Sequence, residues 1–141
     1  MKKVSTVILG AGERGAAYAQ FALDHPDRLQ VVGLAEPREP HRERMAAAHR
    51  VPAERVFTDW RELAQAPRMA DAAIIATPDA LHTEPAIALA ERGYHLLLEK
   101  PMGPTAAECR QIVDAVTSAG VLFGVCHVLR YTDYTKRVKE I

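Results

Sequence analysis

Short apolar segments alternate along the chain with longer segments in which apolar and polar residues recur at helical spacing. The apolar segments are rich in Val, Ile and Leu and are apolar on both faces, as in strands that helices cover on both sides of a parallel sheet. Five strands are predicted in this way: Val4–Leu9, Gln30–Ala35, Ala72–Ala76, Tyr94–Leu98 and Val121–Cys126.

The segments between them carry recognisable helix ends. Asp59 and Thr105 each stand three residues before a glutamate, as in a capping box, and Gly93 and Gly120 stand where a glycine ends a helix. With a short strand before Asp59, strands and helices alternate, which predicts a doubly wound α/β fold with a mainly parallel sheet and helices on both faces. The predicted helices are Arg14–His25, Pro40–Arg50, a short one after Asp59, Thr83–Arg92 and one from Thr105 to Gly120.

The last residues do not continue this alternation. Residues 127–141 begin a new pattern and stop without a capping residue, a glycine or a polar tail. We expect residues 1–126 to form one domain and residues 127–141 to begin the connection to a further, C-terminal domain. Without that domain the edge around Val125–Tyr131 would be uncovered, so a homodimer through this edge is expected.

Composition narrows the classes of function. Eighteen Lys and Arg balance eighteen Asp and Glu, so neither nucleic acid nor an anionic membrane is an expected partner. The first apolar run meets Gly10 too early for a signal peptide, and Cys109 and Cys126 make no disulfide framework, which favours a cytoplasmic protein. The histidines form no H-E-x-x-H motif, and Cys126 and His127 would point to opposite faces of a strand, so no metal site is expected.

The first predicted strand runs directly into a glycine-rich segment at the start of a helix. In such a G-x-G-x-x-G motif, Gly10 permits the tight turn, Gly12 lets a pyrophosphate approach the backbone, and Gly15 lets the helix pack on the strand. The N–H groups of the helix N-terminus then bind the phosphates. The segment predicts a dinucleotide site formed by Gly10, Ala11, Gly12, Glu13, Arg14 and Gly15.

An acidic residue stands where such sites bind the adenosine ribose. Glu36 ends the second strand, twenty-one residues beyond Gly15. A carboxylate there accepts both ribose hydroxyls and repels a 2′-phosphate, which favours NAD over NADP. Arg38 leaves NADP open, because its guanidinium is suited either to stacking on adenine or to binding a 2′-phosphate. The plainer alternative is a glycine-rich turn followed by a surface glutamate.

A methyltransferase that binds S-adenosylmethionine is the nearest competing interpretation. Such enzymes also combine a glycine loop with an acid after the second strand. Their third glycine usually comes one position earlier, where this chain has Arg14. The dinucleotide interpretation is therefore favoured.

Three further polar segments follow predicted strands, at the sheet edge where α/β proteins bind ligands. They are Thr77-Pro78-Asp79-Ala80-Leu81-His82, Glu99-Lys100-Pro101 and His127-Val128-Leu129-Arg130-Tyr131. Three motifs resemble, in their order and spacing, the N-terminal, Rossmann-type nucleotide-binding domain of the glucose-fructose oxidoreductase / inositol dehydrogenase / MocA family. They are G-A-G-x-R-G, A-T-P-D-x-x-H and L-L-x-E-K-P-M. The resemblance covers essentially the whole chain, and E-K-P is its most discriminating motif.

The resemblance implies roles for the E-K-P segment. Lys100 would be the catalytic lysine that hydrogen-bonds the reacting hydroxyl or carbonyl and assists proton transfer. Glu99 would contact the nicotinamide ribose and help to hold Lys100. Pro101 would fix the turn, and the sequence does not decide between its cis and trans forms. Taken alone, Lys100 is also compatible with a solvated surface residue.

The resemblance also implies that Thr77, Pro78 and His82 line the nicotinamide side of the cofactor. His82 is compatible as well with simply supporting the start of a helix. Arg130 would contact the cofactor or an anionic substrate, or else form a salt bridge between domains.

The implied activity is hydride transfer between NAD, or NADP, and a sugar, polyol or related hydroxyl compound. Family members carry the substrate pocket on a second domain, so this chain is expected to bind the cofactor without turnover. A non-catalytic NAD-binding regulatory module and, less favoured, a methyltransferase remain as alternatives.

Overall fold

The computed structural model describes residues 2–140 and contains a six-stranded sheet with the strand order β3-β2-β1-β4-β5-β6. Neighbouring strands are parallel throughout, which confirms the predicted doubly wound fold. The order reverses between β1 and β4, the switch point at which open α/β sheets bind ligands. The strands are β1 (Val4–Leu9), β2 (Leu29–Ala35), β3 (Val56–Phe57), β4 (Ala72–Ile75), β5 (His95–Leu98) and β6 (Phe123–Val125).

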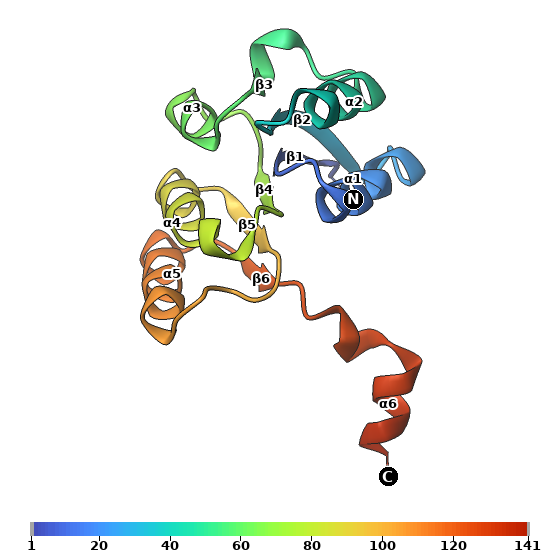
Figure 1. The fold of residues 1–141 in the computed structure, drawn as a ribbon, viewed down its shortest axis with the longest axis vertical. Helices are drawn as coiled ribbons and strands as arrows, with labels where there is room; N and C mark the ends of the chain where they lie inside the picture. The colour runs from blue at the N-terminus through green and yellow to red at the C-terminus, as the bar shows by residue number, and fades with distance from the viewer. Residues whose placement is uncertain (1, 141) are drawn as a thin grey trace.

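Helices cover both faces of this sheet (Figure 1). Ile8 of β1 packs in the core beneath α1 and α2, whereas Val7 and Leu9 pack in the core beneath α3, α4 and α5. Because successive side chains of a strand point to opposite faces, a strand buried on both sides is apolar at every position. The helices are α1 (Glu13–Asp24), α2 (Glu39–His49), α3 (Trp60–Gln65), α4 (Thr83–Glu91) and α5 (Ala106–Ala119).

The predicted helix ends are found where the sequence places them. The Asp59 carboxylate accepts a hydrogen bond from the Arg61 N–H at 2.8 Å, and the Thr105 hydroxyl accepts one from the Glu108 N–H at 3.2 Å. Gly120 ends α5 in the left-handed conformation, with φ at +64°. These caps mark the starts of α3 and α5 and the end of α5, as the sequence predicts.

The last strand differs more from its predicted boundaries than the other strands do. It was expected over Val121–Cys126, but it covers only Phe123–Val125, the residues that pair with Leu96–Leu98 of β5. The expectation that Cys126 and His127 are strand neighbours is therefore wrong, because both lie beyond the paired residues. Short 3-10 turns that the sequence pattern did not indicate occur at Ala53–Arg55, Asp79–Leu81 and Val128–Tyr131.

The C-terminal segment extends away from the sheet and its helices (Figure 1). It consists of the turn Val128–Tyr131 and the helix α6 (Asp133–Lys139). Leu129, Tyr131 and Tyr134 are exposed there. Among residues 2–140, no helix is both long and apolar enough to cross a membrane.

Candidate functional site

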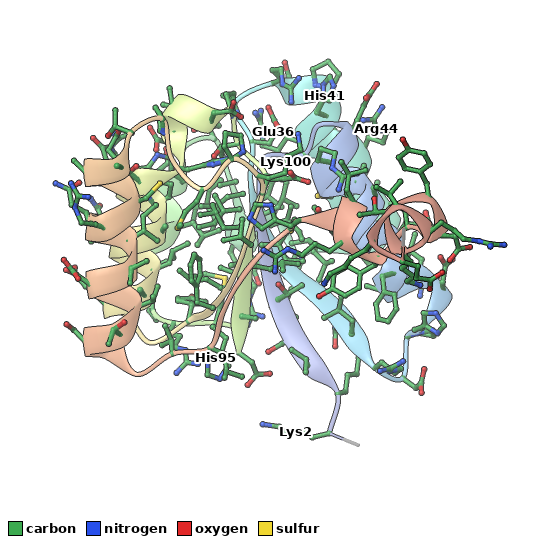
Figure 2. The ribbon with its side chains drawn as sticks, turned by 90° about the horizontal axis from the view of Figure 1, so that it is seen from below. Lys2, Glu36, His41, Arg44, His95 and Lys100 are labelled. Atoms are coloured by element: carbon green, nitrogen blue, oxygen red, sulfur yellow. The ribbon has the colours of Figure 1, made fainter. Side chains whose placement is uncertain are left out.

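The predicted site residues gather at the carboxyl ends of the strands. Figure 2 shows Glu36 and Lys100 at one end of the sheet, and Lys2 and His95 at the opposite end. A cavity of about 750 Å³ opens at the Glu36 end. Its walls come from the glycine loop, the end of β2, the start of α3 and the loop after β4: Gly10, Gly12, Glu13, Arg14, Ala35, Glu36, Pro37, Arg38, Thr58, Asp59, Trp60, Arg61, Ala76, Thr77, Pro78 and Leu81.

The glycine loop requires its glycines for three different reasons. Gly10 has φ at +87°, and a Cβ there would lie 2.6 Å from the Ala76 carbonyl oxygen. A Cβ at Gly15 would overlap the Gly10 carbonyl oxygen, so Gly15 permits the close packing of α1 on β1. A Cβ at Gly12 would meet only the Arg38 side chain, at 3.3 Å. Gly12 thus keeps the backbone beside the cavity accessible rather than relieving a clash.

The N-terminus of α1 faces this loop without a side-chain cap. Gly12 is the N-cap residue, and it has no side chain to accept the first N–H groups of the helix. These N–H groups and the partial positive charge of the helix end are suited to an anion. The local arrangement is that of a phosphate-binding loop.

Glu36 borders the cavity, and its carboxylate is held by hydrogen bonds from within the domain. Its carboxylate is 1% exposed and accepts hydrogen bonds from the Ala11 N–H at 2.6 Å and from the Arg38 N–H at 2.9 Å. The Arg38 guanidinium donates two more, from Nε at 2.8 Å and from Nη2 at 2.9 Å. Burial acts to raise the pKa of Glu36, but Arg38 and the Ala11 N–H outweigh it and lower the pKa to about 2. Glu36 thus ties the glycine loop to the end of β2.

A second buried carboxylate lies at the end of β5. Glu99 Oε1 accepts hydrogen bonds from Arg14 Nε and from the Tyr18 hydroxyl, both at 2.6 Å. Its other oxygen accepts the Lys100 N–H at 2.8 Å. Burial acts to raise the pKa of Glu99, but these hydrogen bonds outweigh it and hold the pKa below its usual value. Glu99 therefore stays ionised and fixes the backbone at Lys100.

Tyr18 is a member of this cluster that the sequence pattern did not reveal. Its hydroxyl donates to Glu99 and accepts from Arg14 Nη2 at 2.6 Å, and the Arg14 guanidinium lies 4.9 Å from the centre of its ring. Burial is the main cause that raises the pKa of Tyr18, so the phenol keeps its proton. The spacing of four residues along the helix is compatible with the contact between Tyr18 and Arg14, but no sequence signal indicates the contact between Tyr18 and Glu99.

Some side chains of the loop after β4 line the cavity, and others are buried in the core. Thr77 and Pro78 line the large cavity. His82 does not, because its side chain is fully buried and its ring nitrogens lie 2.9 Å from the Thr77 carbonyl oxygen and 2.8 Å from that of Pro101. His82 therefore fastens this loop to the turn after Lys100, and no polar atom of its ring is left for a ligand.

Lys100 lies outside the large cavity, on a smaller one of about 250 Å³. Arg130 lines the same small cavity, together with His127, Val128, Leu129 and Thr135. The Lys100–Pro101 peptide bond is cis. The structure thus brings Lys100 and Arg130 together, and it links them to the glycine loop through Glu99 and Arg14.

Among the cavity residues that were not sequence candidates, Trp60 and Arg61 have the largest side chains. Trp60 and Arg61 lie at the start of α3, opposite the glycine loop, and the Arg61 guanidinium stacks 4.5 Å from the centre of the Trp60 ring. No motif signals them, since only the sheet brings the end of β3 beside that of β2. Residues 2–140 contain no group of three or more His, Cys, Asp or Glu side chains that could hold a metal ion.

Residues 4–127 match the family model described as "Oxidoreductase family, NAD-binding Rossmann fold", the model of the Gfo/Idh/MocA proteins. The chain belongs to this family. The match confirms the resemblance seen in the motifs, and it favours a dinucleotide over S-adenosylmethionine.

Curated relatives of the chain include several sugar and polyol dehydrogenases. It is 29% identical over 143 residues to the scyllo-inositol 2-dehydrogenase (NADP(+)) IolW of Bacillus subtilis, covering 99% of the chain and 38% of that protein. It is 38% identical over 94 residues to the levoglucosan dehydrogenase of Pseudarthrobacter phenanthrenivorans, covering 67% of the chain and 24% of that protein. The chain thus spans well under half the length of these relatives.

Among solved structures, the WlbA dehydrogenase of Bordetella pertussis, crystallised with NADH and UDP-GlcNAcA, matches with a TM-score of 0.89 and 26% identity. That match covers 99% of this chain and 41% of WlbA. The similarity in fold therefore extends over nearly the whole of this chain.

Proposed function

We propose that this chain is the cofactor-binding domain of an oxidoreductase that transfers a hydride between NAD(P) and a hydroxyl-bearing carbon of a sugar or polyol. The observation that carries the proposal is the cavity of about 750 Å³ between the uncapped N-terminus of α1 and the ends of β2 and β4. Its loop is anchored by the buried Glu36, so the N–H groups facing the cavity are held in place before a ligand arrives.

The larger cavity would bind the cofactor, and Lys100 on the smaller one would contact the substrate. Gly12 and the first N–H groups of α1 would hold the pyrophosphate, and Trp60 and Arg38 would border the adenosine. When bound, the nicotinamide ring supplies the acceptor or donor of the hydride. The Lys100 ammonium would hydrogen-bond the reacting oxygen and stabilise negative charge that develops there. Glu99 would keep Lys100 in position through its backbone N–H.

The relatives support the substrate class. Two are named as dehydrogenases of scyllo-inositol and of levoglucosan, and the WlbA structure contains NADH and a nucleotide sugar. Sugars and polyols are the class of compound that these names share.

The proposal includes a longer protein in which another domain closes the substrate pocket. The chain covers 38% of IolW and 41% of WlbA, so most of each relative has no counterpart in these 141 residues. We infer that residues 1–126 bind the cofactor, that residues 127–141 lead toward that domain, and that these 141 residues alone show negligible turnover. A cytoplasmic location is part of the same proposal.

The uncovered edge suggests self-association of the isolated chain. Strand β6 pairs on one side with β5, and beyond it Leu129 and Tyr131 are 68% and 76% exposed. Contact between two copies would bury these side chains. Sedimentation should therefore give a mass that rises with concentration, and a monomer mass at every concentration would contradict this part of the proposal.

A calorimetric titration with NADH, NADPH and S-adenosylmethionine tests the cofactor assignment. The wild type should bind a nicotinamide dinucleotide and not S-adenosylmethionine. Gly12→Ala should weaken dinucleotide binding by roughly tenfold or more, because its methyl group occupies the space the phosphates need. Gly124→Ala is the matched control, since a Cβ there makes an ordinary 3.6 Å contact with Leu97, away from the cavity. Folded wild-type protein that binds neither dinucleotide would refute the proposal.

A further inference from the structure

The backbone around Lys100 is held on both sides by side chains whose further contacts lie at the larger cavity. On one side, Glu99 Oε2 accepts the Lys100 N–H at 2.8 Å. On the other side, the Pro101 carbonyl oxygen lies 2.8 Å from one ring nitrogen of His82. The second ring nitrogen of His82 lies 2.9 Å from the carbonyl oxygen of Thr77, which lines the larger cavity. Lys100 itself lines the smaller cavity, so its position depends on contacts made at the other one.

The two sides differ in how readily a ligand can reach them. His82 is fully buried, so the contact at Pro101 is enclosed by protein. Glu99 is buried as well, but the Arg14 side chain bonded to it is 47% exposed and lines the larger cavity. A ligand in that cavity can therefore act on the Glu99 side of Lys100.

Arg14 bonds to Glu99 along one edge of its guanidinium. Nε donates to Glu99 Oε1 at 2.6 Å, and Nη2 donates to the Tyr18 hydroxyl at 2.6 Å. The Tyr18 hydroxyl donates to the same Glu99 oxygen at 2.6 Å, so the three side chains form a closed ring of hydrogen bonds. The remaining N–H groups of the guanidinium have no hydrogen-bond partner among residues 2–140. They are available to an anion in the larger cavity.

The chemistry of arginine makes it suited to connect the two contacts. A guanidinium is planar and rigid, so a phosphate that bonds to the open edge of Arg14 also reorients the edge that bonds to Glu99. The same phosphate shares the positive charge that Glu99 otherwise has to itself. Arg14 stands in the first turn of α1, directly after the uncapped N-terminus at Gly12. A ligand at the glycine loop thus changes the setting of Glu99, and with it the hydrogen bond to the Lys100 N–H, without touching Lys100.

We propose that Arg14 is a positioning residue for Lys100, and that phosphate binding at the glycine loop changes the position of the Lys100 backbone through Arg14 and Glu99. The inference rests on the proposed function and adds to it a coupling between the two cavities. Such coupling requires that the ligand interact differently with two arrangements of the Arg14 side chain, which its open N–H groups allow. Tyr18 closes the ring and limits the directions in which Arg14 and Glu99 move.

The wild-type chain provides the first test, in amide NMR spectra recorded during a titration with 5′-ADP. ADP carries phosphates but no nicotinamide, so it brings no group that would contact Lys100 directly. The Lys100 amide signal should shift with the same saturation as that of Gly12. A saturable Gly12 shift with the Lys100 signal unmoved would overturn the inference and leave the proposed function intact. Failure of both ADP and NADH to bind the folded chain would instead refute the proposed function.

Variants then assign the effect to Arg14. Arg14→Met removes every N–H group of the guanidinium, so at saturating ADP the Lys100 amide should lose most of its shift while the Gly12 amide still moves. Arg61→Met is the matched control, because it removes another arginine that lines the same cavity but pairs with Glu84. It should keep the full Lys100 shift. A full Lys100 shift in Arg14→Met would overturn the inference.

A conservative variant keeps the test if Arg14→Met does not fold. Arg14→Lys retains the positive charge but replaces the rigid fork by a single ammonium group, which cannot hold the ligand and Glu99 as parts of one plane. The Lys100 shift at saturating ADP should then fall to about half or less of its wild-type size. An undiminished shift in Arg14→Lys would contradict the inference.

Discussion

Replacing Glu36 by glutamine should destabilise the domain at neutral pH and have little effect in acid. The wild-type carboxylate accepts all of its hydrogen bonds from Ala11 and Arg38. A glutamine keeps one acceptor oxygen but presents an NH₂ group to the donors on its other side. Some of these donors therefore lose their partner, and the Arg38 guanidinium loses its counter-charge.

The pKa of Glu36 gives the size of the effect. Burial opposes ionisation, but Arg38 and the Ala11 N–H more than compensate, and the pKa falls from 4.5 to about 2. At about 1.4 kcal/mol per pKa unit, this shift corresponds to about 3 kcal/mol of stability at neutral pH. Solvent screening at the half-exposed Arg38 reduces the expected loss to about 1–3 kcal/mol. Each kcal/mol lowers Tm by about 3–5 °C in a domain of this length.

The direction of the pH dependence follows from the same shift. Because the folded-state pKa of Glu36 lies below the unfolded-state value of 4.5, the stabilisation is complete well above that pH. It is lost as the pH falls through 4.5 toward 2, where the folded carboxyl also takes up a proton. The difference between wild type and Glu36→Gln should therefore shrink steadily over this interval.

Urea unfolding of both proteins from about pH 7 down to about pH 3 measures this difference. Glu91→Gln, which removes an exposed carboxylate at the end of α4, is the control and should follow the wild type at every pH. A Glu36→Gln difference that is absent, or that stays constant across the pH range, would refute the assigned role of Glu36.

Two further variants test the cluster around Glu99. Tyr18→Phe removes one hydrogen bond to Glu99, so the domain should lose about 1 kcal/mol in urea unfolding, and the Glu99 pKa should rise toward its usual value in an NMR titration. An unchanged Glu99 pKa would contradict the role given to Tyr18. Lys100→Ala should leave dinucleotide affinity nearly unchanged and, in a catalytically complete protein, remove most of kcat. A large loss of affinity would make Lys100 a cofactor contact, and an unchanged kcat would favour a regulatory module.

The fold was predictable because its signals are local. Strands buried on both faces are apolar at successive positions, and the capping residues Asp59 and Thr105 mark helix starts within a few residues. The glycine loop was predictable for a similar reason, since Gly10 has a positive φ and a Cβ at Gly15 would overlap the Gly10 carbonyl oxygen within the same loop.

The orientation of the polar side chains was not predictable, because it depends on donors that only the fold brings together. Glu36 was expected to bind a ribose, and the sequence did not indicate that the Ala11 N–H and Arg38 would hydrogen-bond its carboxylate. His82 was expected in the cavity, but two carbonyl groups from separate loops enclose it. Tyr18 has the spacing of an ordinary core residue of α1, and its contact with Glu99 joins positions 81 residues apart.

The most direct test of the account is to map the dinucleotide on the chain by NMR. At 15.5 kDa, the protein is suited to amide spectra recorded during a titration with NADPH or NADH. The account predicts that the amide signals of Gly12, Arg14, Arg38 and Thr77 shift together and saturably, while those of Gly120 and Gly124 stay in place. Saturable shifts confined to other parts of the chain, or no shifts at all, would contradict it.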